Sequence, residues 1–152
     1  MPHLQLDVAA KYDVSVKREL ARRFGNHYAQ IMQTTADLVH VTIREHGEGG
    51  VWHCTNADPV TPAAVLMADI RRGRPPEQRA LLGEALIKEC VELLGIDPLS
   101  MNVEFTQHAG DEVYGTLLVD GIVRGGLAKD WSPSETQTPL AATLAAEQRA
   151  HG

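Results

Sequence analysis

The sequence predicts an α+β protein made of two consecutive βαβ units. These units would form a four-stranded sheet with both helices on one face and short hairpin strands beside it. Four apolar-rich stretches, at residues 4–8, 39–44, 64–70 and 101–106, have the pattern of strands. Each pair of stretches encloses an apolar stripe with helical spacing. Since a helix between parallel strands almost always makes a right-handed crossover, both helices are expected on the same face.

The first half begins with a strand at 4–8, in which apolar and polar residues alternate. Either Asp13 or Ser15 is a suitable N-cap for the helix that follows. The apolar stripe of this helix consists of Val16, Leu20, Phe24, His27/Tyr28 and Ile31. A second alternating strand covers 39–44, and a glycine-rich turn then leads into a short strand at 51–54.

The second half repeats this order. The apolar run 64–70 suits a central strand. The Pro-Pro-Glu sequence at 75–77 favours a helix start, because proline fits the first turn and an acidic side chain suits the positive end of the helix dipole. The stripe of this helix is Leu82, Ala85/Leu86, Cys90 and Leu93/Leu94, ended by Gly95. The last strand is expected at 101–106, and a short strand follows at 112–115.

Matching positions of the two halves recur at one constant spacing along the chain. The matched pairs are Val39/Met101, Val41/Val103, Ile43/Phe105, His46/His108, Val51/Val113 and Trp52/Tyr114. The helices are expected to match with a slip of about one residue, as Leu20 and Leu81 indicate. Equal spacing, matched turns and matched elements together predict an internal duplication.

One face of the predicted sheet has no segment left to cover it, so we expect an oligomer packed with these faces inward. The duplicated domain is expected at 1–126, with halves at 2–56 and 63–118. Residues 127–152 form a C-terminal extension. Its Ala-rich stretch 139–150 predicts a helix that either packs on a neighbouring subunit or frays.

Charge and composition exclude several classes of function. The net charge of −6 leaves no basic stripe for phosphates, so no nucleic-acid partner is expected. The longest nearly uncharged apolar stretch, 61–68, is too short to cross a bilayer, and no secretory signal is visible. We therefore expect a cytoplasmic protein with no membrane partner.

The two cysteines and seven histidines lack metal-ligand spacing, and no dinucleotide loop or P-loop is present, so neither a metal nor a cofactor is predicted. Cys90 is expected in the core.

Pro2 is the first candidate for chemistry. A small residue after the initiator favours removal of Met1, which would leave a secondary amine at the head of the first strand. Burial disfavours the charged form of an amine and lowers its pKa, so this amine could transfer protons at neutral pH.

Three arginines, Arg71, Arg72 and Arg74, surround Gly73 between the third strand and the second helix. Arginine binds carboxylates through two parallel hydrogen bonds, and a helix N-terminus adds further N–H groups. A small carboxylate substrate is therefore the predicted partner. The alternative is a solvated basic loop.

Further polar residues are expected on the polar faces of the strands: His40, Thr42, Arg44, Asn102 and Glu104. In an oligomer they either form hydrogen bonds between subunits or line a pocket. Glu104, as a buried carboxylate near arginines, is a candidate acid or base. His27 and Tyr28 end the buried part of the first helix. Trp52 and Tyr114 are predicted to form pocket walls or subunit contacts.

An amino-terminal proline after Met1, two βαβ units in one chain, and the sequence Gly-Arg-Pro-Pro-Glu-Gln-Arg at 73–79 together resemble the tautomerase superfamily. The 73–79 stretch is similar to that of 4-oxalocrotonate tautomerase, whose short subunit corresponds to one half of this chain. The chain length, and a tail with Trp, Ser and Glu at 131–135, resemble the cis-3-chloroacrylic acid dehalogenase group. The resemblance covers residues 2–120 and, less closely, the tail.

The resemblance implies that the amine of Pro2 moves the proton, that Arg71 and Arg74 hold the substrate carboxylate, and that the protein is a homotrimer. The further substrate-binding candidates are His27, Tyr28, Arg72, Glu112 and Tyr114. The chain departs from the dehalogenase pattern at three positions. Tyr28, with His27 beside it, stands where that group has a histidine, and Glu104 stands where it has a strand tyrosine. The water-activating glutamate of that group aligns near Val113, with Asp111 and Glu112 close by.

These residues predict a tautomerase or isomerase of a small 2-oxo or 2-hydroxy-unsaturated carboxylate. The first alternative is a cis-3-haloacrylate dehalogenase or hydratase, in which protonated Pro2 is the acid and Glu104 or Glu112 activates water. The second alternative is a catalytically silent, oligomeric binding protein that retains Met1.

Overall fold

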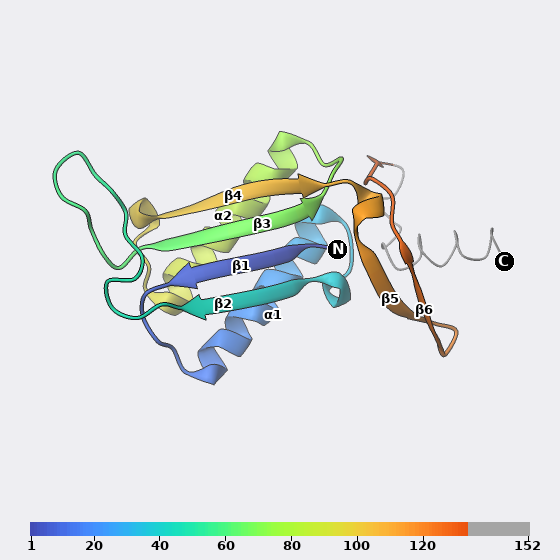
Figure 1. Ribbon diagram of the computed structural model, residues 1–152, viewed down its shortest axis with the longest axis horizontal. Helices are drawn as coiled ribbons and strands as arrows, with labels where there is room; N and C mark the ends of the chain where they lie inside the picture. Colours follow the sequence, from blue (N-terminus) through green and yellow to red (C-terminus); the bar gives the residue numbers. More distant parts are fainter. Residues whose placement is uncertain (134–152) are drawn as a thin grey trace.

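The computed structural model describes residues 1–133 and contains two βαβ units in sequence (Figure 1). The elements of the first half are β1 (His3–Val8), α1 (Val14–Met32), a 3₁₀ turn (Ala36–Leu38) and β2 (His40–Glu45). Those of the second half are β3 (Ala64–Arg71), α2 (Pro76–Leu94), a 3₁₀ turn (Pro98–Ser100) and β4 (Met101–His108). A third 3₁₀ turn (Gly110–Glu112) leads into the hairpin of β5 (Tyr114–Val119) and β6 (Ile122–Leu127).

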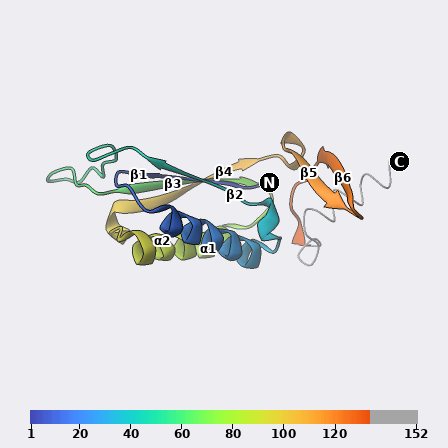
Figure 2. The ribbon, with the colours of Figure 1, turned by 90° about the horizontal axis from the view of Figure 1, so that it is seen from below.

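The four main strands form one sheet in the order β2-β1-β3-β4, and both helices lie on the same face of it (Figure 2). The α+β fold class and the placement of the helices are therefore confirmed. No described element covers the opposite face. The predicted helix at 139–150 lies outside the described residues.

The internal duplication is visible in the strand register. Both parallel pairs have the same offset between partners, as in His3 with His40 and Val65 with Asn102. β1 and β3 are antiparallel, and Gln5 lies opposite Met67, its own counterpart in the second half. An approximate two-fold axis therefore passes between these two residues and relates the halves. As a consequence, the start of β1 lies beside the end of β3.

The helices follow the same spacing as the strands, which corrects one expectation. Both α1 and α2 contain 19 residues, and they begin at Val14 and Pro76. The counterpart of the buried Leu20 is the buried Leu82, whereas Leu81 is 57% exposed. The expected slip of one residue was wrong, because two adjacent leucines fit the helical period almost equally well and only burial distinguishes them.

The core lies between the sheet and the two helices. β1 contributes Leu4, Leu6 and Val8, and their alternation with exposed or half-buried neighbours is that of a strand with one buried face. The other fully buried members include Leu20, Phe24, Leu66, Ile70, Leu82, Leu86 and Cys90. The expectation that Cys90 is a core residue is confirmed, and burial raises the pKa of its thiol to about 12.

The short strands differ from the prediction. Residues 51–54 form no strand, and only an isolated bridge joins His53 to Val60. In the second half, Glu112 belongs to a 3₁₀ turn, and the strand from Tyr114 pairs with β6, which was not predicted. The turn between β5 and β6 is Asp120-Gly121, with positive φ at both residues (51° and 76°). This dipeptide favours two-residue hairpin turns, so the sequence did carry a signal for this hairpin.

No helix among residues 1–133 is long and apolar enough to span a membrane.

Candidate active site

Pro2 lies at the head of β1, beside the end of β3. Its side chain is buried, and its carbonyl oxygen accepts a hydrogen bond from the His40 N–H at 3.2 Å. The antiparallel register pairs His3 with Asp69, so the next residues of β3 lead directly to Arg71. The duplicated topology therefore brings the first residues of the chain to the arginine-rich segment.

Arg71 and Arg74 are both buried, with only 3% and 4% of their surfaces exposed. Arg71 ends β3 and donates from Nη1 to the Lys129 carbonyl at 2.9 Å. Arg74 donates from Nε to the Met32 carbonyl, in the last turn of α1, at 3.0 Å. Two guanidinium groups buried at one cavity are costly to desolvate and carry like charges, which is typical of a site that binds an anion.

The guanidinium carbon of Arg74 lies near two aromatic rings. The ring centroid of Tyr28 is 5.7 Å away, and that of Trp131 is 5.2 Å away. Both distances are within the range of cation–π interactions. The Tyr28 hydroxyl is buried and has no hydrogen-bond partner among the described residues, so it is available to a bound ligand.

A small cavity connects these groups. Its lining residues are Met1, Pro2, Tyr28, Thr34, Leu38, Arg71 and Arg74, and its volume of about 10 Å³ leaves room for one water at most. Met1 contributes to the filling, since its side chain packs against Leu38 and Ala128. Met1 and Pro2 also line an open groove of about 480 Å³. It is also lined by His3, His40, Thr42, Asp69, Val113 and Tyr114.

Electrostatics at this end of the sheet favour a neutral amine. Burial, followed by the positive charges of Arg71 and Arg74, lowers the pKa of the Met1 α-amino group from 8.0 to about 6, while Asp69 opposes the change. Burial raises the pKa of Tyr28 to about 12, although the two arginines favour its ionised form. At neutral pH the site therefore contains a neutral tyrosine and favours the unprotonated form of an amine.

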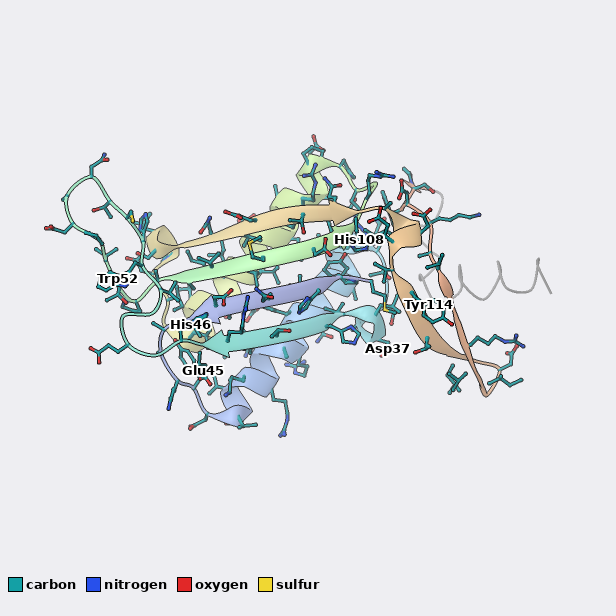
Figure 3. All side chains as sticks on the ribbon, viewed as in Figure 1. Asp37, Glu45, His46, Trp52, His108 and Tyr114 are labelled. Atoms are coloured by element: carbon teal, nitrogen blue, oxygen red, sulfur yellow. The ribbon has the colours of Figure 1, made fainter. Side chains whose placement is uncertain are left out.

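Asp69 contributes a carboxylate to the open groove. It accepts a hydrogen bond from Thr106 Oγ1 at 2.8 Å, and its second oxygen lies 3.2 Å from His108 Nδ1. The first half contains the same pair at the matching positions, with His46 Nε2 at 2.6 Å from the Asp7 carboxylate. Figure 3 shows that His108 and Tyr114 lie at one end of the sheet, and His46 and Trp52 at the other.

The two-fold axis provides an internal comparison for the arginines. The counterpart of Arg74 is Tyr12, whose hydroxyl donates to the Leu94 carbonyl at 3.0 Å, just as Arg74 donates to Met32. The counterpart of Arg71 is Ala9. A neutral residue thus makes the structural hydrogen bond at one end of the molecule, so the fold itself does not require a charge at position 74.

The structure brings together four of the predicted site residues: Pro2, Arg71, Arg74 and Tyr28. Tyr114, which is exposed, lines the adjoining groove.

The other predicted residues lie elsewhere. His27 Nε2 contacts Glu89 at 2.9 Å on the helical layer, and Arg72 points outward to Asp130 at 2.9 Å. Glu104 is exposed on the uncovered face of the sheet within one chain, and Glu112 is exposed in a 3₁₀ turn. Neither glutamate lines the cavity or the groove beside Pro2.

Sequence reasoning did not select Asp69, His3 or Leu38 as site residues. Asp69 had a detectable signal, because Asp7 and Asp69 stand at matching positions of the two halves, like the histidines His46 and His108. Within residues 1–133, no three His, Cys, Asp or Glu side chains converge in a way that could hold a metal ion.

Many solved structures share this fold. N1, a member of the cis-3-chloroacrylic acid dehalogenase (cis-CaaD) family, is 17% identical, with a TM-score of 0.66 over 88% of this chain and 86% of its own. Native fused 4-OT is 23% identical, with a TM-score of 0.61 over 79% and 94% of the two chains. Malonate semialdehyde decarboxylase is 19% identical, with a TM-score of 0.59 over 72% and 87%.

The chain has the tautomerase-superfamily fold. The resemblance noted in the sequence is thereby confirmed at the level of fold. No protein-family model and no curated protein matches the sequence. The chemistry of this member of the fold must therefore be argued from its own residues.

Proposed function

We propose that this protein is a proline-dependent tautomerase of a small 2-oxo or 2-hydroxy-unsaturated carboxylate. The observation that carries the proposal is the position of Pro2 beside two buried arginines, Arg71 and Arg74, at one end of the sheet. The opposite end has Ala64, Ala9 and a hydrogen-bonding tyrosine at the matching positions. The charges are therefore specific to the end that contains the proline.

The mechanism requires the amine of Pro2 to be free, and thus requires removal of Met1. Burial and the two arginines, which lower the pKa of the Met1 amine, act on a Pro2 amine at the same place. Removal of Met1 also takes away a side chain that lines both the arginine cavity and the open groove. One cleavage would then create both the base and the space for a substrate.

In the proposed reaction the substrate carboxylate binds Arg71 and Arg74. The neutral nitrogen of Pro2 accepts the enol hydroxyl proton as the C–O bond becomes a carbonyl. The electron pair of the C=C bond then takes a proton from the Pro2 ammonium at carbon. The atoms of substrate and product are the same, and Pro2 returns to its neutral state. The arginines stabilise the enolate charge that forms between the two steps, and the Tyr28 hydroxyl can donate to the same charge.

The haloacrylate dehalogenase alternative required Glu104 or Glu112 to activate water. Neither side chain lines the space beside Pro2 within one chain, so tautomerisation is the better supported reaction. Halide release from a cis-3-haloacrylate at high enzyme concentration would contradict this preference.

A homotrimer is part of the proposal. The uncovered face of the sheet carries polar and charged side chains such as Gln5, Thr42 and Glu104, and it has no covering element among the described residues. A fused 4-OT of the same fold has been solved as an asymmetric trimer. Multi-angle light scattering would measure the subunit number.

The first test is the ketonisation of phenylenolpyruvate, followed by ultraviolet absorbance, with Met1-free protein confirmed by mass spectrometry. The Pro2→Ala variant, which has a primary amine, is the comparison. A rate that collapses in this variant supports Pro2 as the proton carrier, and equal rates in both proteins would refute the proline mechanism. Absence of activity in both would favour the silent binding protein.

An independent test uses an electrophile. One protein of this fold has been crystallised after inactivation by 2-oxo-3-pentynoate. If Pro2 is a free, neutral amine near the arginines, this acetylenic 2-oxo acid should add once, at the amino-terminal peptide. Labelling should be lost when Met1 is retained, because an acylated proline nitrogen is not nucleophilic.

A further inference from the structure

Residues 128–131, which follow β6, cross the loop that contains the arginines. We refer to this segment as the strap. Its Lys129 carbonyl accepts the hydrogen bond from Arg71 Nη1 at 2.9 Å, and the Trp131 N–H donates to the Arg72 carbonyl at 2.7 Å. Ala128 packs against Leu38 and Met1, which border the Pro2 cavity. The strap therefore contacts both the candidate site and its loop.

Asp130 joins the strap to two segments. One carboxylate oxygen accepts the Gly110 N–H at 2.8 Å, and the other accepts Arg72 Nε at 2.9 Å. These contacts hold the pKa of Asp130 below its usual range, so the carboxylate is ionised at neutral pH. The strap is thereby fixed both to the 3₁₀ turn that follows β4 and to the arginine loop.

The close approach of the strap depends on two glycines. A Cβ at Gly73, which has φ of +127°, would collide with the backbone of Trp131, and a Cβ at Gly110 would collide with the Lys129 carbonyl group. The backbone chains therefore lie in direct contact at both points. Such contacts leave little freedom for the loop between Arg71 and Arg74.

Trp131 is buried against Arg74. Its ring lies 5.2 Å from the Arg74 guanidinium carbon, and only 6% of the tryptophan surface is exposed. The Tyr28 ring lies 5.7 Å from the same atom. Because an arginine side chain has many rotamers, a guanidinium held near two rings and bound at Nε to Met32 loses little freedom when an anion arrives.

We propose that Trp131 is a positioning residue for the carboxylate site: through the strap, it holds Arg74 in the orientation that receives the substrate carboxylate. The inference rests on the proposed function, because it concerns the same arginines. Trp131 touches Arg74 and not the reacting atoms, so its effect is expected on substrate binding more than on the proton transfer.

The test compares Trp131→Leu, Trp131→Phe and Trp52→Leu in Met1-free protein. Trp52 is the matched control, since it is the other tryptophan of the chain and lies exposed at the far end of the sheet. Trp131→Leu should raise KM for phenylenolpyruvate by about tenfold to a hundredfold, because a small displacement of a binding group can cost that much. Trp131→Phe keeps an aromatic ring and should restore KM to within about threefold of wild type. Trp52→Leu should leave KM unchanged.

A purely structural role would lower the folded fraction, and hence kcat per total protein, without changing KM. Unchanged KM in a folded, active Trp131→Leu variant would thus overturn the positioning role and leave the tautomerase proposal standing.

Calorimetric titration with phenylpyruvate can show the opposite outcome, in which the tautomerase proposal fails and the positioning role stands. Wild type that binds this 2-oxo acid without any turnover, with affinity reduced in Trp131→Leu and restored in Trp131→Phe, would refute the tautomerase and retain the positioning role. Equal affinity in all three proteins would overturn the positioning role.

Discussion

Arg74 and its counterpart Tyr12 allow the structural and the functional parts of one side chain to be separated. Both residues donate to the carbonyl of a helix-terminal residue, at 3.0 Å in each case, but only Arg74 carries a charge. The informative variants are Arg74→Met and Tyr12→Phe. Methionine fills similar space with an unbranched chain, and both substitutions delete the hydrogen bond to the helix.

The effects on stability should be similar and modest. Loss of the Tyr12 hydroxyl removes a neutral hydrogen bond, worth about 1 kcal/mol, whereas Arg74 makes a charge-assisted bond worth about 1.5–3 kcal/mol. Arg74→Met also removes the desolvation penalty of a buried cation, which offsets part of that loss. At about 2–4 °C per kcal/mol for a chain of this size, the melting temperature should fall by only a few degrees in either variant.

The effects on activity should differ greatly. Removing one partner of a buried charge pair costs about 2–5 kcal/mol, which corresponds to a loss of about 30-fold to 5,000-fold in kcat/KM. Tyr12→Phe removes nothing that a substrate at the Pro2 end can contact, so its kcat/KM should remain within a factor of about two. The assay is phenylenolpyruvate ketonisation, with thermal unfolding followed by circular dichroism on the same samples.

The reasoning would be refuted if both variants, fully folded at the assay temperature, lost the same fraction of activity. Arg74 would then act through the helix end, like Tyr12, and the carboxylate would bind elsewhere. Activity of Arg74→Met at the wild-type level would lead to the same conclusion.

The charges around Pro2 and the packing of β3 give three further expected outcomes. Burial and the nearby arginines lower the pKa of the Met1 amine, and they should lower that of a free Pro2 amine at the same place. If neutral Pro2 is the base, kcat/KM of the Met1-free protein should therefore rise with pH and level off at a lower pH than an exposed amine would give; a profile that falls over this range would contradict Pro2 as the base. Asp69 raises that pKa, so Asp69→Asn should move the rising limb to lower pH, whereas Asp7→Asn, the matched change in the first half, should leave the limb in place. Leu66→Ala, at a fully buried site of β3, should lower the free energy of unfolding in urea by about 2–5 kcal/mol; a loss below about 1 kcal/mol would show that the site repacks.

Much of the fold could be predicted from the sequence because its signals are local and repeated. The alternation in β1 and the Pro-Pro-Glu start of α2 depend on neighbouring residues only. Because each element occurs in both halves, its pattern in one half also supports its prediction in the other. Burial against the sheet is a property of the assembled core, so periodicity could not distinguish Leu81 from Leu82. The β5–β6 hairpin was missed although Asp120-Gly121 is a typical hairpin turn.

The site divides in the same way. Pro2 is recognised by its place at the start of the chain, and the arginines by their local motif. The antiparallel register of β1 with β3 places them together. His27 and Tyr28 are adjacent on α1, and only packing decides that Tyr28 points to the cavity while His27 binds Glu89. Trp131 lies far along the chain from Arg74, beyond β6, so its contact depends on the path of the whole β5–β6 hairpin.

The duplicated fold allows the two ends of the molecule to be compared, and only one of them has the proposed reactive residues. Each half supplies the same backbone positions, and the first-half counterparts of Arg71 and Arg74 are Ala9 and Tyr12. Cys90, at the counterpart of Tyr28, is buried in the core with Glu89 as the charge that acts on it. The same backbone positions at the other end are thus occupied by neutral residues, so the duplicated architecture does not by itself call for two guanidinium groups. The proposal that a substrate carboxylate binds at this end rests on the position of Pro2 beside the two arginines, which the opposite end does not repeat.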